Sequence, residues 1–77
     1  MQLTLDKGKI GCQYNIRSVQ SDIVASKLMA MGVRAGATLR ILRKTWLGRA
    51  ICIKSEGIVI ALRHNEASVI IVEILSK

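Results

Sequence analysis

Few side chains of this chain have types and spacings that support chemistry. The one histidine, His64, stands two positions before Glu66, an arrangement that offers a base beside an acid. There is no second histidine for a proton relay, and the other carboxylates are scattered along the chain. The glycines also lack the spacing of a phosphate-binding loop. The sequence therefore predicts no catalytic residues, and we interpret 63–66 as a solvated turn.

A metal site needs three or four converging nitrogen, sulfur or oxygen ligands. The candidate ligands are His64, Glu66 and Cys52, and only the first two are neighbours in sequence. Two cysteines, Cys12 and Cys52, are too few for the disulfide scaffold of a small secreted domain. Both are expected to be reduced thiols, buried or partly so. We expect no resident metal and no cofactor, with a metal-binding or metal-sensing module as an alternative.

The charge balance favours a binding role. The chain has 12 Lys and Arg against 5 Asp and Glu, which gives a formal net charge of +7. Such an excess predicts an acidic partner: a nucleic acid, an anionic membrane surface or an acidic protein face. Proteins that bind single strands stack bases on several aromatic rings, but this chain has one Trp and one Tyr. We therefore expect a protein partner, with a small basic barrel that binds nucleic acid as the alternative.

One segment combines basic and large apolar residues. Trp46 and Leu47 are expected at the tip of a loop, with Arg43 before them and Arg49 after them. Trp and Arg are among the residues that most often dominate protein interfaces. These four residues form the predicted partner-binding site. The alternative for Trp46 is a ring that folds back as a lid on the core.

Hydrophobic periodicity predicts one helix and five short strands. A Ser21 or Asp22 cap begins the helix and Gly32 ends it. Its apolar stripe is formed by Ile23, Val24, Ala25, Leu28 and Met31. Alternation predicts strands at 14–19, 37–43, 50–54, 58–63 and 68–74, preceded by an extended arm. The side chains expected to face inward on the last two strands are Ile58, Ile60, Leu62, Ile70, Val72 and Ile74.

These elements predict a single domain over residues 1–77, with a core from about 3 to 75. A flat sheet would leave two unpaired edges, so we expect a mainly β fold that closes into a small barrel, with one short inserted α-helix. The run 69–72 is apolar on both faces, which suggests a homodimer or a docked partner. The start lacks a secretory signal and the apolar runs are too short to span a membrane. We therefore expect a cytoplasmic protein.

Two stretches carry a family pattern. The first runs Leu28, then Met31-Gly32-Val33, Gly36 and Leu39, and the second runs Ala61-Leu62-Arg63, Glu66-Ala67, Ile70 and Val72. Together they resemble FeoA, a small protein of bacterial ferrous iron uptake, and the resemblance extends from about Leu3 to Ile74. The chain departs from the pattern at Ala35, where the family often has Pro.

The resemblance implies a five-stranded SH3-like barrel without established enzymatic activity. It also implies a regulatory partner, the membrane ferrous-iron transporter FeoB, whose cytoplasmic portion carries a GTPase domain. Such a partner would bring the protein to the membrane only peripherally. The matching positions are expected to be turn and core positions, so they specify fold more than contact: Leu28, Gly32, Gly36, Leu62, Arg63, Ala67, Ile70 and Val72.

Overall fold

The computed structural model of this chain describes residues 2–45 and 49–76. The strands form one antiparallel sheet in the order β1-β6-β2-β3-β4-β5. Their bounds are β1 Gln2–Thr4, β2 Gln13–Val19, β3 Thr38–Lys44, β4 Ala50–Ser55, β5 Ile58–Arg63 and β6 Ile70–Ser76. Two α-helices and a 3-10 turn complete the elements: α1 Asp22–Ala30, α2 His64–Ala67 and η1 Leu5–Lys7.

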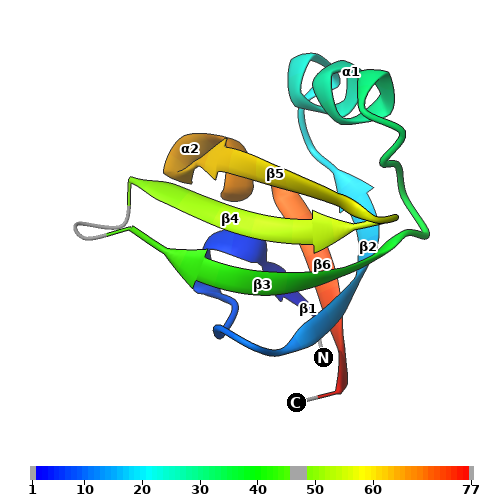
Figure 1. The fold of residues 1–77 in the computed structure, drawn as a ribbon. Helices are drawn as coiled ribbons and strands as arrows, with labels where there is room; N and C mark the ends of the chain where they lie inside the picture. The colour runs from blue at the N-terminus through cyan, green and yellow to red at the C-terminus, as the bar shows by residue number, and fades with distance from the viewer. Residues whose placement is uncertain (1, 46–48, 77) are drawn as a thin grey trace.

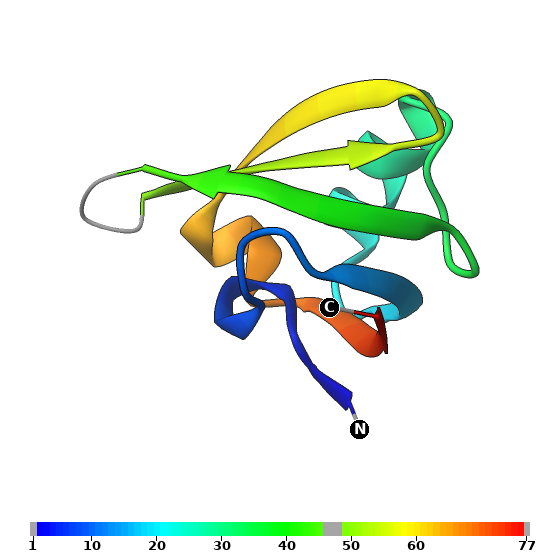
Figure 2. The same cartoon turned by 60° about the horizontal axis from the view of Figure 1, so that its bottom comes forward.

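The sheet curls until its two halves face each other. In Figure 1, β3, β4 and β5 cross in front of β6 and β2, and Figure 2 shows the same arrangement from below. The register shifts between Ile16 and Ser18 in β2, and again between Ile41 and Arg43 in β3. Bulges of this kind bend a strand and increase its twist, which the curling requires.

The predicted fold class is confirmed, but a second short helix, α2, occupies the segment expected to be a turn, and the sheet differs in two respects. The fold is mainly β and SH3-like, but its sheet is curled rather than closed into a barrel. In the described chain, β1 and β5 each have one neighbouring strand. The sheet also has a sixth strand, because β1 lies in the segment expected to be an extended arm and pairs with β6. A three-residue strand is too short to show an alternating pattern, so the sequence carried no signal for it.

The core lies between the two halves of the sheet and consists mostly of aliphatic side chains. Leu39, Ile41, Ile51 and Ile53 point into it from β3 and β4, as alternation predicts. At Gly8 the backbone lies close against the core, because an added Cβ would lie 2.5 Å from the Ile41 side chain. No side chain larger than hydrogen fits there without displacing the core.

Three apolar side chains that were expected inside are exposed. Ile23 is 84% exposed, because α1 packs only through Val24 and Leu28, which follow a helical spacing that leaves Ile23 to one side. Ile58 and Ile74 are 41% and 37% exposed. Both lie near strand ends, where alternation still places them on the inner face but the facing half of the sheet no longer covers them.

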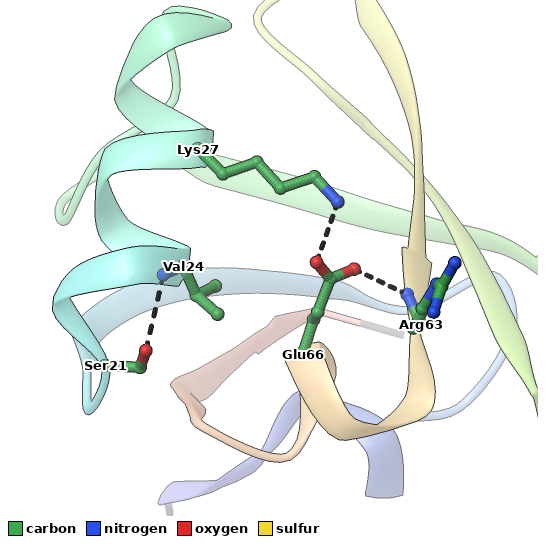
Figure 3. A network of polar contacts seen from close by, with 5 residues as sticks. All are labelled: Ser21, Val24, Lys27, Arg63 and Glu66. Atoms are coloured by element: carbon green, nitrogen blue, oxygen red, sulfur yellow. Dashed lines mark hydrogen bonds and ion pairs between the residues drawn. The ribbon is translucent and has the colours of Figure 1, made fainter.

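A glutamate ties the two helices together (Figure 3). The ammonium of Lys27 in α1 donates to Glu66 Oε2 at 2.8 Å, and the backbone N–H of Arg63 donates to Oε1 at 2.9 Å. These contacts, with the Lys27 hydrogen bond as the largest cause, hold the pKa of the Glu66 carboxyl below its ordinary value. At the start of α1, the Ser21 hydroxyl accepts from the N–H of Val24, as a cap does.

The turn between β4 and β5 consists of Glu56 and Gly57, both with positive φ of 52° and 77°. This is the conformation that joins twisted antiparallel strands through two residues, and it favours Asn-Gly. Gly57 therefore suits this turn, and Glu56 is the residue that fits it least well. In the described part of the chain, no helix is long and apolar enough to cross a membrane.

We expect Glu56→Asn to stabilise the protein, because Asn tolerates positive φ better than Glu. The expected gain in the free energy of unfolding is about 0.5–1 kcal/mol, measured by urea unfolding. Glu56→Ala is the control, since it removes the same carboxylate but keeps a side chain that disfavours positive φ. An equal gain in both variants would show that charge, not turn geometry, is responsible.

We expect the stabilising contribution of the Glu66 charge to depend on pH. Because folding lowers the pKa of Glu66, its contribution is present above the ordinary Glu pKa and is lost as pH falls through the folded value. Glu66→Gln should therefore cost about 1 kcal/mol at pH 7, and the difference from wild type should vanish in acid. Urea unfolding between pH 3 and 7 measures it.

Glu56→Gln is the matched control for this experiment, because Glu56 is exposed in the turn between β4 and β5. Its effect should stay within about 0.5 kcal/mol at every pH. A cost of Glu66→Gln that is the same at pH 3 and pH 7 would contradict the assignment.

Candidate interaction surface

The structure places the candidate residues for catalysis and metal binding apart from one another. His64 Nε2 lies 3.3 Å from Asp6 Oδ2 in η1, whereas the Glu66 carboxylate is held by Lys27 and Arg63 toward α1 (Figure 3). Cys52 lies on the other face of β4 from the buried Ile51 and Ile53. Across residues 2–45 and 49–76, no three His, Cys, Asp or Glu side chains gather as a metal site would require. His64 and Glu66 therefore do not form an acid–base pair.

The positions that carry the family pattern lie mostly in the interior and at turns. Leu28, Leu62, Ala67, Ile70 and Val72 are buried. Gly32 and Gly36 have φ of 84° and 95°, in the region that glycine adopts most readily. Arg63 is the exception, because its side chain is exposed at the end of β5. These residues build the fold and, apart from Arg63, offer little surface to a partner.

Two residues of the predicted partner-binding site are described and both are exposed. Arg43 lies on β3 opposite Cys52, and Arg49 directly precedes β4. Trp46 and Leu47 lie outside the described residues. Thr45, which lies between the two arginines, makes two hydrogen bonds with Ala50. Its N–H donates to the Ala50 carbonyl at 2.9 Å, and its hydroxyl accepts from the Ala50 N–H at 2.9 Å.

The outer face of β3, β4 and β5 carries a group of cations, which we call the basic face: Arg40, Arg43, Lys54 and Arg63. Alternation with buried neighbours turns these side chains outward. Arg40 and Lys54 are cross-strand partners, so two like charges stand directly opposite each other. Such a pair destabilises a sheet unless a negative group lies nearby.

The acidic side chains do not neutralise the basic face. Two carboxylates are in ion pairs elsewhere, Glu66 with Lys27 and Glu73 with Arg17, and Asp6 Oδ2 lies 3.3 Å from His64 Nε2. Asp22 lies in the first turn of α1, and Glu56 lies in the turn at the end of β4. No ion pair to the four cations is found in the described part of the chain. The Glu66 carboxylate interacts electrostatically with Arg63. The other three cations, Arg40, Arg43 and Lys54, present uncompensated positive charge on an extended, regular surface.

Of the four cations of the basic face, only Arg43 belongs to the partner-binding site predicted from the sequence. The alternation in 50–54 and 58–63 signals that Lys54 and Arg63 point outward. The register of β3 against β4 was not readable, because it depends on the bulge after Ile41. That register is what places Arg40 beside Lys54.

Two hollows lie on either side of the loop between α1 and β3, and neither collects reactive groups. The larger, of about 480 Å³, is lined by Gly32, residues 34–37 and Glu56. The smaller, of about 270 Å³, is mostly apolar and lies between α1 and Val19 of β2. The charged outer face is therefore the stronger candidate for function.

Comparison with known proteins identifies the fold family. The FeoA domain family model matches residues 3–74. The FeoA protein from Chlorobium tepidum is 35% identical, with a TM-score of 0.89, over 96% of this chain and 71% of that one. Among curated proteins, no sequence matches the chain.

Two further solved structures contain this fold within longer chains. The iron(II) transport protein A from Clostridium thermocellum is 30% identical with a TM-score of 0.87, over 95% of this chain and 46% of that one. Zinc-bound ScaR is 26% identical with a TM-score of 0.84, over 95% of this chain and 37% of that one. The family match over nearly the whole chain, together with the curled SH3-like sheet, shows that this protein belongs to the FeoA family.

Proposed function

We propose that this protein is an accessory of bacterial ferrous iron uptake that acts by binding the cytoplasmic portion of the transporter FeoB. Membership of the FeoA family supports the association with iron uptake. The observation that carries the binding role is the basic face, four cations on a regular surface, of which Arg40, Arg43 and Lys54 have no acidic partner in the described chain. It calls for an acidic surface on another molecule.

Charge complementarity determines what such an interaction achieves. A positive face speeds encounter with a negative one and orients the two proteins, and salt weakens both effects. The dispersed titratable groups support a role in binding rather than in catalysis. In this proposal the protein works on the cytoplasmic side of the membrane and reaches the bilayer only through its partner.

The binding test uses the purified chain and the GTPase-containing cytoplasmic domain of the FeoB transporter from the same iron-uptake system. We expect association at micromolar concentration in low salt, weakening as salt rises. Arg43→Glu should weaken it about tenfold, because the change reverses a charge in the basic face. Lys7→Glu, in η1, is the matched control and should bind as wild type. The absence of binding at tens of micromolar in low salt would contradict the proposed function.

A second variant tests Trp46, the loop residue that the sequence predicts to contact the partner. If Trp46 anchors the partner, Trp46→Ala should weaken binding about tenfold, while the thermal midpoint stays nearly unchanged. Isothermal titration and a thermal melt measure the two quantities on the same sample. A large fall in the midpoint would show instead that the ring belongs to the core.

A further inference from the structure

The two edges of the sheet differ in how well they resist pairing with another strand. β1 is three residues long, and a very short edge offers few groups for pairing. β5 is six residues long and pairs with β4 without a register shift. It contains no Pro and no Lys, the residues that commonly protect an edge. Among the described strands, β5 is therefore the open edge.

The hydrogen-bond phase shows which residues of β5 face the open side. The N–H of His64 donates to the Arg49 carbonyl at 3.0 Å, and the two-residue turn makes Ser55 and Ile58 a bonded pair at the other end. Because bonded and non-bonded pairs alternate in an antiparallel ladder, Val59 and Ala61 direct their backbone groups away from β4. The remaining outward N–H, that of Arg63, is already bonded to Glu66.

The side chains beside this edge suit an acidic strand. Val59 is 60% exposed and is the cross-strand partner of Lys54, which in turn faces Arg40. A strand added next to β5 would extend the basic face by one row. Its outward side chains would lie beside Val59 and Arg63, within reach of Lys54, the cation of β4. Acidic residues at alternate positions complement this row.

Charge also decides against a second copy of this chain at the same edge. Each copy carries a formal net charge of +7, and pairing β5 with β5 would join two basic faces into one. Like charges placed together in this way repel.

We propose that β5 accepts an extended acidic segment of the partner protein as an additional strand. The inference rests on the proposed function for the identity of the partner. The surface itself rests on the open edge, the outward groups of Val59 and Ala61, and the basic face. In this mode of recognition, main-chain hydrogen bonds provide affinity and alternate side chains provide specificity.

Two variants of β5 test the edge. Val59→Glu places a negative charge opposite Lys54, where it should pair favourably and keep the fold stable while repelling an acidic strand. Ala61→Pro removes an N–H that points away from β4, so no bond of the existing ladder is lost. We expect each to weaken binding of the FeoB cytoplasmic domain at least tenfold, with the thermal midpoint recorded for both.

The control is an acidic substitution outside the edge, which should bind as wild type. Ile23→Glu makes the same apolar-to-acidic change on α1 and serves as the matched control for charge. Amide hydrogen exchange gives an independent readout, because partner binding should slow exchange at Val59 and Ala61. Unchanged affinity in Val59→Glu, or protection confined to other elements, would overturn the inference and leave the proposed function standing.

A ten-residue peptide alternating Glu and Val separates the two proposals. If the FeoB domain does not bind, the proposed function fails, and the peptide alone then tests the edge. Protection of Val59 and Ala61 by this peptide, but not by its Lys-Val counterpart, supports the inference. No protection by the acidic peptide overturns it. A dimer of this chain that Val59→Glu dissociates, or protection by single-stranded RNA in place of the peptide, would also overturn it.

Discussion

The structure depends on one constraint: a single antiparallel sheet must form a core by covering its own inner face. Among the described residues no second layer is large enough to do so, since α1 contributes only Val24 and Leu28 to the core as buried residues. The sheet therefore curls, with bulges in β2 and β3 at the places where it bends. Burial of Ile, Leu and Val side chains between the two halves provides the main stabilisation.

Curling without closing has a consequence for the outer surface. The inner face of β3, β4 and β5 is mostly used by the core, so charged residues collect on the outer face. The Arg40–Lys54 pair stands across two bonded strands, and in the described chain no carboxylate offsets it. The open edge of β5 borders the same face. The basic face and the open edge of β5 therefore both follow from the way in which the sheet curls to form the core.

The polar contacts around α2 show how the small helices are held without a large core of their own. Glu66 accepts from both Lys27 and the backbone of Arg63 (Figure 3). His64 lies beside Asp6 of η1. One residue of α2 thus faces α1 and another faces the start of the chain. Residues that look like a candidate acid–base pair in the sequence serve here to connect elements that are distant in sequence.

The sequence by itself determined the element types, most of the core and the excess of positive charge. Alternation correctly predicted that Leu62 and Val72 face inward, and Gly32 marked the end of α1 because its backbone conformation favours glycine. These signals are local, since they depend on the spacing of residues within one element.

Only the tertiary structure decided how far the sheet closes and which side chains meet. Ile23, Ile58 and Ile74 are exposed, although their local patterns match those of buried residues. The sixth strand, the contact of His64 with Asp6 and the pairing of Arg40 with Lys54 all join segments that are far apart in the chain. Periodicity within an element carries no information about register or bulges, because these arise from pairing between elements and from the curvature that core formation imposes.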